Sequence, residues 1–356
     1  MRLLAYTDAR SLGGAEIALG HLLAELDSSI EVDVVGVDTF VAEAVASRRA
    51  DTNIRVLAPV RNKADVPNIA AHVRAVRALE PWIVHVNLFT PWTGQYGILA
   101  GLVTRRPVVA VEQVVFGSPT SLQRRLRRLL CSGLTAHVAV GERAARGIEE
   151  LIGLTEGCVE TIHNGVPDIP LEPVERPRPG PTVGSIGRLH EQKGLDVLIR
   201  ALALLPDVTG VLVGDGPERG NLERLARDLG VRDRIVITGW VENARDYLPS
   251  FDLVAAPSRF EGFPLAVIEA MLARRPVVAS AVDSIPEAVE HGSTGLLVPP
   301  DAPDALAEAI STLLDDRAKR EAMGKRARSR ALESFTASSM ARSFEALYCR
   351  ILEDHA

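Results

Sequence analysis

Two glutamates in one short stretch, residues 258–271, have the residue type and the spacing to bind hydroxyl groups. The apolar run at residues 253–256 predicts a buried strand, and an apolar period that begins near Pro264 and ends near Ala273 predicts a helix. Glu261 therefore lies in a loop just before the helix, and Glu269 lies inside it.

The start of this predicted helix has the features of an anion site. Pro264 suits the first helical position, because its fixed φ is already helical and its missing N–H has no intrahelical partner there. The amides of Gly262, Phe263, Leu265 and Ala266 then converge at the positive end of the helix dipole. A phosphate fits such a site, and because it would repel the two carboxylates, we expect them to bind hydroxyl groups instead.

The whole stretch, SRFEGFPLAVIEAM, with its glutamates spaced E-x7-E, resembles the signature of the retaining glycosyltransferases of family 4. The resemblance implies an α/β fold of GT-B architecture, in which two Rossmann-like domains face each other across a cleft. It also implies that Glu261 faces the transferred sugar of a nucleotide sugar and that Glu269 faces the ribose hydroxyls. The alternative is a solvated loop residue and the polar face of an ordinary helix.

Length and composition limit the class of protein. The 356 residues, 47% of them hydrophobic, suit two domains better than one core. A net charge of -6 argues against nucleic acid as a partner. Cys131, Cys158 and Cys349 lack metal or disulfide spacing, which favours a reducing, cytoplasmic location. The first residues read as a buried strand rather than a signal peptide, and no apolar run is long enough to span a membrane.

Short apolar runs alternate with helical periods along most of the chain, which predicts two mostly parallel sheets with covered faces. Residues 167–181 contain six prolines and predict an extended connection. The resemblance further implies that the last helix crosses back to the first domain. We therefore predict an N-terminal acceptor-binding domain at 1–166, a linker at 167–181, a nucleotide-sugar-binding domain at 182–334 and a returning C-terminal helix at 335–356.

Residues 187–194 follow the first predicted strand of the second domain. Arg188 and Lys193 in this loop could reach one diphosphate, the arginine as a multi-donor fork and the lysine as a compact charge. They resemble the diphosphate clamp of the family, and a solvated basic loop is the alternative.

Several glycines also follow predicted strands. Gly13 and Gly14 precede the first helix, where bare backbone can approach a phosphate. They resemble the N-domain loop that contacts the donor phosphate in the family, and a plain tight turn is the alternative. Four further candidates resemble the loops that flank the nucleotide base, with ordinary turn chemistry as the alternative: Gly214, Gly216, Gly239 and Trp240.

The acceptor side has weaker candidates. His85 and Asn87 end a strand and point into the cleft if the fold is right, but a buried histidine bonded to a neighbour is equally compatible. Where many relatives carry a histidine after the next strand, this chain has Glu112 and Gln113. An amide cannot act as a base, so the enzyme does without that histidine or uses Glu112 or His85.

Residues 122–130 form a basic amphipathic pattern, with leucines on one helical face and arginines elsewhere. Such a helix can make weak contact with an anionic membrane surface. The alternative is that the leucines pack into their own domain while the arginines are solvated.

Together these patterns and the family resemblance predict a transfer of sugar from a UDP- or GDP-linked donor to a hydroxyl acceptor, which is a small molecule, a glycan or a lipid-linked compound. The resemblance implies that the transfer proceeds with retention. We expect no metal and no cofactor other than the donor substrate, because Arg188, Lys193 and a helix dipole can neutralise the leaving diphosphate. The alternatives are a sugar-nucleotide epimerase or phosphorylase of the same architecture, and a non-catalytic sugar-nucleotide-binding protein. The expected location is cytoplasmic, with a peripheral position on the inner face of the membrane as an open alternative.

Overall fold

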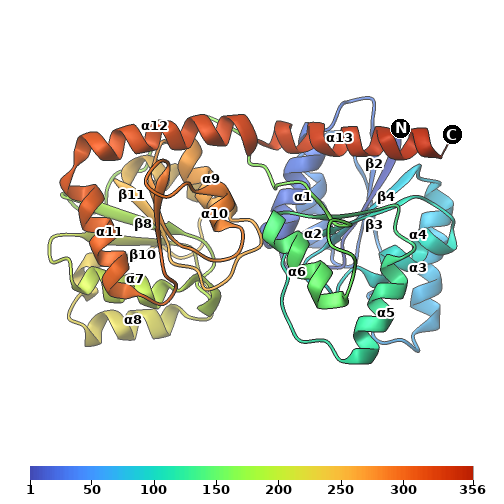
Figure 1. The fold of residues 1–356 in the computed structure, drawn as a ribbon, viewed down its shortest axis with the longest axis horizontal. Coiled ribbons are helices and arrows are strands. Elements are labelled where there is room, and N and C mark those ends of the chain that lie inside the picture. Colours follow the sequence, from blue (N-terminus) through green and yellow to red (C-terminus); the bar gives the residue numbers. More distant parts are fainter. Residues whose placement is uncertain (356) are drawn as a thin grey trace. The chain divides into compact units, whose positions relative to one another are not determined.

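The computed structural model describes residues 1–355, which divide into two compact units (Figure 1). Unit 1 comprises Met1–Pro167 together with Thr336–Ala356, and unit 2 comprises Asp168–Phe335. Each unit has its own parallel sheet and its own hydrophobic core.

Unit 1 contains a seven-stranded sheet in the order β3-β2-β1-β4-β5-β6-β7, and all of its strand pairs are parallel. The order reverses at β1, which lies between β2 and β4, and ligands of such sheets bind near this point at the carboxyl ends of the strands. The strands are β1 (Arg2–Tyr6), β2 (Glu31–Gly36), β3 (Asn53–Val56), β4 (Ile83–Leu88), β5 (Val108–Glu112), β6 (Ala136–Ala139) and β7 (Glu160–Thr161). The helices are α1 (Gly14–Glu25), α2 (Thr39–Ala46), α3 (Val66–Leu79), α4 (Gln95–Val103), α5 (Ser121–Cys131), α6 (Glu142–Ile152) and α13 (Ala337–Asp354).

The last helix, α13, belongs to unit 1 although it ends the chain. Its apolar residues recur at helical spacing and are buried, among them Met340, Phe344 and Tyr348. The helix packs against α1. This confirms the prediction that the C-terminal helix returns to the N-terminal domain.

Unit 2 contains a six-stranded parallel sheet in the order β10-β9-β8-β11-β12-β13, with the reversal at β8. The strands are β8 (Thr182–Ile186), β9 (Thr209–Val213), β10 (Ile235–Ile237), β11 (Leu253–Ala256), β12 (Val277–Ser280) and β13 (Gly295–Val298). The α-helices are α7 (Leu195–Ala203), α8 (Arg219–Asp228), α9 (Leu265–Leu272), α10 (Ile285–Ala288), α11 (Pro303–Asp315) and α12 (Arg317–Ser334), and the 3-10 helices are η1 (Glu191–Lys193), η2 (Arg232–Arg234) and η3 (Ala244–Ser250).

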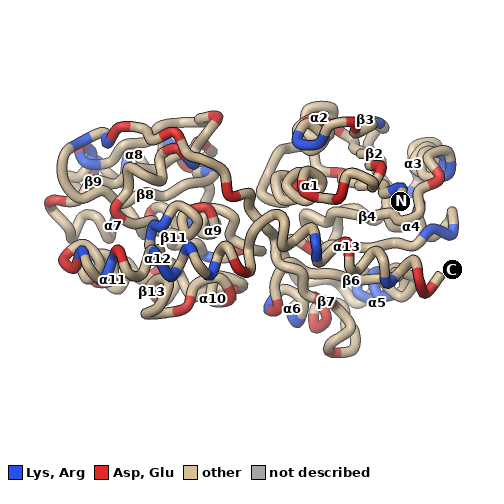
Figure 2. The backbone as a smooth tube through the Cα atoms, turned by 90° about the horizontal axis from the view of Figure 1, so that it is seen from above, with Lys and Arg blue, Asp and Glu red and all other residues tan. Residues whose placement is uncertain are grey.

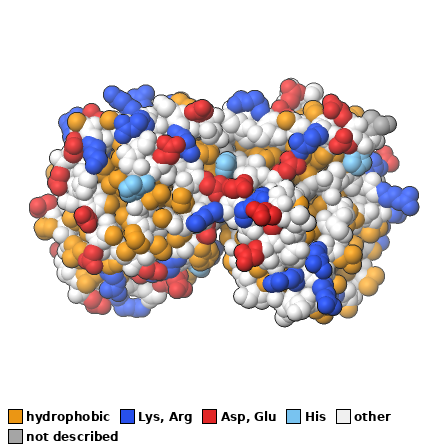
Figure 3. Space-filling model, in the orientation of Figure 1, with side chains coloured by type: hydrophobic (Ala, Val, Ile, Leu, Met, Phe, Trp, Pro, Cys, Tyr) orange, Lys and Arg blue, Asp and Glu red, His pale blue; other side chains and the backbone are white. Residues whose placement is uncertain are grey.

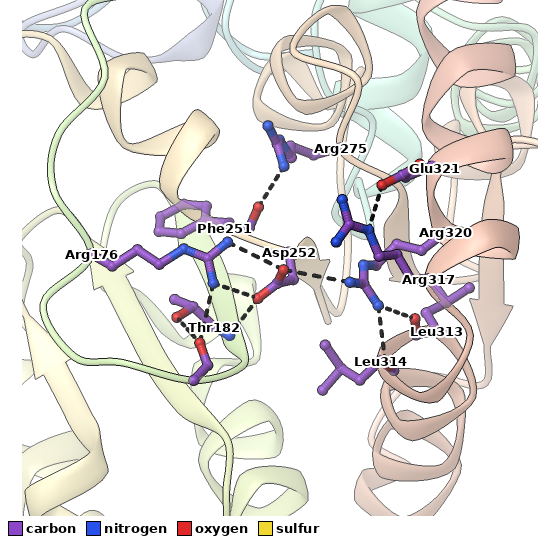
Figure 4. A network of polar contacts seen from close by, with 11 residues as sticks. Arg176, Thr182, Phe251, Asp252, Arg275, Leu313, Leu314, Arg317, Arg320 and Glu321 are labelled. Carbon is purple, nitrogen blue, oxygen red and sulfur yellow. Dashed lines mark hydrogen bonds and ion pairs between the residues drawn. The ribbon is translucent and has the colours of Figure 1, made fainter.

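The proline-rich segment lies along unit 2. The amide of Val174 donates to the carbonyl of Asp246 at 3.1 Å. Arg176 binds the carboxylate of Asp252 at 2.9 Å, and that carboxylate also accepts the amide of Thr182 at 2.9 Å (Figure 4). Asp252 thus holds the segment against the start of β8 and β11. The donors are Arg176 and Thr182, because the prolines of the segment have no N–H to donate.

Candidate donor site

The loop after β8 lies across the end of β9 in unit 2. The amide of Gly187 donates to the carbonyl of Val213 at 3.0 Å, and the amide of Leu189 donates to the carbonyl of Asp215 at 2.9 Å. A Cβ atom on Gly214 would lie 2.1 Å from the carbonyl oxygen of Gly187, so only glycine allows this approach. Gly216 is confined in the same way, because a Cβ atom on it would lie 2.3 Å from the carbonyl oxygen of Leu189. These two glycines therefore have a packing role, and their contact with a donor stays a prediction.

Lys193 and Glu261 come together although they are distant in sequence. The Nζ atom of Lys193 lies 2.6 Å from Oε1 of Glu261, and the hydroxyl of Ser258 donates to the same oxygen at 2.7 Å. The side chains are partly accessible, with 26% of Lys193 and 9% of Glu261 exposed. Gly194 permits the contact, since it has φ +59° and a Cβ there would lie 2.0 Å from the carbonyl oxygen of Pro257. The loops after β8 and β11 thus present one polar pair.

Arg188 lies in the same loop as Lys193 and is exposed. Within residues 1–355 its guanidinium makes neither an ion pair nor a hydrogen bond. The loop therefore offers one cation engaged by a carboxylate and a second cation without a protein partner.

The helix after Glu261 begins one residue later than predicted. α9 starts at Leu265, and Pro264 is its N-cap residue, with φ −83° and ψ 87°, so the proline precedes the first helical position. No side chain caps this end, which leaves the amides of Leu265 and Ala266 available to an anion, whereas the amide of Val267 donates to the carbonyl of Pro264 at 3.0 Å. Gly262 and Phe263 are buried, and the Phe263 ring packs against Phe335 with centroids 5.4 Å apart. The phenyl group is therefore structural, whereas the amide remains a candidate.

Glu269 faces a different environment from Glu261. Its Oε1 lies 3.6 Å from Nε of Arg245, and its side chain is 14% exposed. Both residues line a cavity of about 350 Å³, together with Leu171, Leu272 and other residues of unit 2. The two glutamates of the motif therefore occupy separate surroundings.

Gly239 and Trp240 lie in the loop that follows β10. Gly239 has φ +76° and forms an antiparallel bridge with Gly214, so the ends of β9 and β10 lie side by side. Trp240 is 77% exposed, which leaves its indole open to a ligand. Their role beside a nucleotide base stays a prediction.

In unit 1, His85 is enclosed by the C-terminal helix. Its Nδ1 lies 2.7 Å from the hydroxyl of Tyr348, and its ring lies 5.2 Å from that of Phe344. Burial lowers the pKa of His85 to about 3. The side chain points to α13 rather than to an open surface. His85 is therefore a buried histidine bonded to a neighbour, which was the alternative to a role on the acceptor side.

Glu112 is fully buried in a charged cluster with Arg127 and His137. Its Oε1 lies 2.7 Å from Nη2 of Arg127 and 2.9 Å from Nε2 of His137. Burial raises the pKa of Glu112, but the Arg127 charge and the His137 hydrogen bond outweigh burial, so its pKa lies below its ordinary value. This carboxylate holds α5 to the sheet, and it has no open path to an acceptor in unit 1.

A chain of buried amides joins the remaining candidates of unit 1. Asn87 donates to the carbonyl of Ala15 at 3.2 Å, Gln113 donates to Asn87 at 2.8 Å, and Asn164 donates to Gln113 at 2.8 Å. The chain fixes the start of α1, directly after Gly13 and Gly14, to the ends of β4 and β5. The acceptor-side role of Asn87 and Gln113, and the phosphate contact of the two glycines, stay predictions.

Sequence reasoning missed Glu16, which lies in the first turn of α1 and is buried. The hydroxyl of Thr7 donates to it at 3.5 Å. Burial raises the pKa of Glu16 to about 7. The available signal was a charged residue two positions after a glycine pair, in the first turn of the predicted helix.

Residues 1–355 were also compared with the requirements of a metal site and of a membrane-spanning helix. No group of three His, Cys, Asp or Glu side chains is placed to hold a metal ion. None of the helices in this range has both the length and the apolar character that a membrane crossing needs.

Two family models match the chain: residues 12–168 match glycosyltransferase family 4, and residues 180–316 match glycosyl transferases group 1. The chain belongs to glycosyltransferase family 4. Among curated relatives, this family 4 chain is 39% identical over 155 residues to the alpha-D-kanosaminyltransferase of Streptomyces kanamyceticus, covering 41% of the chain and 40% of the relative. It is also 39% identical over 159 residues to a GDP-mannose-dependent phosphatidylinositol monomannoside mannosyltransferase of Mycobacterium tuberculosis, covering 40% and 41%. The chain thus spans about two fifths of the length of these relatives.

Solved structures confirm the fold along the whole chain. The crystal structure of HepE from Anabaena in complex with UDP has a TM-score of 0.86 at 23% identity, covering 98% of this chain and all of the other. A glycosyltransferase from Rickettsia africae has the same TM-score at 19% identity, covering 99% and 98%. The predicted GT-B architecture with two Rossmann-like domains is therefore confirmed.

Proposed function

We propose that this family 4 glycosyltransferase transfers a sugar, with retention, from a UDP- or GDP-linked donor to a hydroxyl group. The observation that carries the proposal is the Lys193–Glu261 pair at 2.6 Å, in the same loop system as the unpartnered Arg188. Parallel sheets of this kind bind ligands at the carboxyl ends of their strands, and these charges lie in the loops that follow such ends. The relatives named for GDP-mannose and the HepE complex with UDP support this donor class.

The charges suit a leaving diphosphate. Arg188 and Lys193 would face its oxygens, and the uncapped amides of α9 would add the positive end of a helix dipole. Such fixed donors act most strongly when negative charge develops on the departing group. These protein cations fill the role that a divalent metal has in other transferases, so we expect turnover without added metal.

Glu261 would bind the transferred sugar. Both side chains that contact its carboxylate, Lys193 and Ser258, bind Oε1, so Oε2 is left for a sugar hydroxyl. We assign Glu269 and the cavity that it lines to the ribose hydroxyls. Since His85 and Glu112 are buried in unit 1, the departing phosphate is the base that we propose for the acceptor hydroxyl.

The proposed acceptor is a small molecule, a glycan or a lipid-linked compound, and the proposed location is the cytoplasm. The three cysteines are free, which favours a reducing compartment. A peripheral position on the inner face of a membrane depends on a separate feature, the surface of α5.

A donor panel tests the function. The full chain is incubated with UDP- and GDP-sugars in excess EDTA, and the slow release of nucleotide diphosphate is measured. We expect release from one donor class, at a rate that Mg²⁺ changes by less than about twofold. Conversion of the sugar without release would instead identify an epimerase. Binding of a donor without release or conversion would identify a non-catalytic binding protein. In a separate reaction, sugar 1-phosphate formed from a glycan and inorganic phosphate, with no nucleotide sugar present, would identify a phosphorylase.

A further inference from the structure

Helix α5 of unit 1 presents its leucines to solvent. Leu122 is 66% exposed, Leu126 45% and Leu129 71%. They recur at helical spacing and so form one stripe along the helix. The interpretation in which the leucines of this segment pack into their own domain is wrong for these three, and only Leu130 packs against the core. An apolar stripe of this kind needs a partner.

The helix is held by a charged residue and by Leu130 rather than by the three leucines of the stripe. Arg127 is 2% exposed and reaches the buried Glu112 at 2.7 Å, and Cys131 joins a small apolar cluster at the end of the helix. A capping box between Thr120 and Gln123 fixes the other end. This attachment along one edge is what allows the leucine stripe to face outward.

The stripe is flanked by positive charge that the protein does not neutralise. Arg124, Arg125 and Arg128 are exposed, and none of their side chains has a hydrogen bond or an ion pair within residues 1–355. The helix contains no acidic residue. Its basic character is seen in Figure 2, and Lys or Arg side chains lie over it in Figure 3. The whole chain has a net charge of -6, so this is a local reversal of sign.

The end of α4 lies beside the end of α5. The side chain of Leu102 lies beside Gly133, just after α5, where a Cβ would meet it at 3.0 Å. Val103, which follows Leu102, is 52% exposed, and Arg105 is exposed as well. Exposed apolar and basic side chains thus occur on two neighbouring elements.

We propose that this surface, formed by α5 and the end of α4, docks onto an anionic lipid bilayer. Leucines would enter the boundary between headgroups and acyl chains, and arginines would extend their charged ends to lipid phosphates. The charge complementarity selects this partner. A second copy of the chain would set uncompensated arginines against arginines, and a nucleic acid would meet protruding leucines and a net negative protein. The proposal goes beyond the proposed function, since it makes no claim about donor or acceptor.

Vesicle sedimentation tests the proposal on the full chain. We compare vesicles of equal parts phosphatidylglycerol and phosphatidylcholine with vesicles of phosphatidylcholine alone. Binding is expected only to the anionic vesicles and should weaken as salt rises. Leu129→Glu, and separately the triple change Arg124→Gln, Arg125→Gln and Arg128→Gln, should each lower the partition coefficient at least about tenfold. The matched control is Leu204→Glu at the end of α7 in unit 2, where Leu204 is 54% exposed, and it should leave binding unchanged.

Three outcomes would overturn the proposal. The first is equal sedimentation of the wild-type chain with anionic vesicles and with phosphatidylcholine vesicles. The second is binding to anionic vesicles that neither α5 variant reduces. The third is a wild-type dimer that Leu129→Glu converts to a monomer in sedimentation velocity, because the stripe would then be covered by a second copy. Release of nucleotide diphosphate by the α5 variants is measured without vesicles. This assay tests the proposed function alone, so its result is separate from that of vesicle binding.

Discussion

Both units carry polar side chains on their strands or in the loops that follow them, but those side chains differ in access. In unit 2, Lys193 and Glu261 form a partly exposed pair and Arg188 is open. In unit 1, His85 is 2% exposed and Glu112 is fully buried. Both sheets are parallel and both reverse their strand order once.

The elements that pack over these side chains explain the difference. The hydroxyl of Tyr348 from α13 covers the histidine of β4, and the guanidinium of Arg127 from α5 covers the carboxylate of β5. A strand end is therefore a place where a ligand can bind, and the elements that return over it decide whether the side chain binds a ligand or its own protein.

The largest effect is expected from breaking the buried pair of unit 1. Arg127→Ala leaves Glu112 buried without its cation, and such a loss costs about 3–5 kcal/mol of stability. Arg128→Ala, at an exposed position of the same helix, should change stability by less than about 0.5 kcal/mol. Calorimetry of the full chain checks both, with the two units as separate transitions if they unfold independently. Similar losses in both variants would show that Glu112 does not depend on the ion pair.

The next effect is a dependence of unit 1 stability on pH. The pKa of Glu16 rises from 4.5 to about 7 in the folded state, so the native carboxyl keeps a proton that the unfolded chain loses between these values. Stability therefore falls as pH rises through this window. Glu16→Gln should remove the loss, so the variant gains up to about 3 kcal/mol relative to wild type between pH 5 and pH 8. A difference that stays constant over this range would contradict the account.

His85 gives a change of opposite sign that can be separated in the same titration. Its pKa is lowered from 6.5 to about 3, so its contribution to stability is complete above pH 6.5 and is lost as pH falls toward 3. The effect of Glu16 is thus read as the difference in stability between wild type and Glu16→Gln, in which the slope from His85 cancels because both proteins keep that residue.

A smaller effect should separate the two glutamates of unit 2. Glu261→Gln should chiefly lower kcat, by about tenfold or more, because contacts to the sugar matter most when charge develops there. Glu269→Gln should chiefly raise the donor KM, because a bond to ribose acts equally in the ground and transition states. Steady-state kinetics with the donor varied would reveal exchanged roles if the two patterns were reversed. Unchanged constants in both variants would remove the E-x7-E assignment.

The sequence predicted the fold and the unit 2 loops well because their signals are local. The alternation of short apolar runs and helical periods specifies parallel sheets, and the stretch with Glu261 needs only its own strand, loop and helix. The approach of Lys193 to Glu261 follows from two neighbouring strand ends. The start of α9 was placed one residue early, since Pro264 suits both the N-cap and the first helical position.

The environment of the unit 1 residues could not be read in this way. Whether His85 is open depends on Tyr348, at the far end of the chain, and the outward leucines of α5 depend on the choice of Arg127 as the buried residue. An amphipathic pattern predicts that one face is buried, but the energy of a buried ion pair can reverse the choice of face.

The central claim is that the charges of the loop after β8 act on the donor diphosphate. Rates of nucleotide diphosphate release by Arg188→Ala and Lys193→Ala test it most directly, with Arg200→Ala as control, since Arg200 is an exposed arginine of α7 in the same unit. We predict that the first two fall at least about tenfold while the thermal midpoint barely moves, and that the control stays within about twofold of wild type. Rates within twofold of wild type in all three variants would contradict the claim.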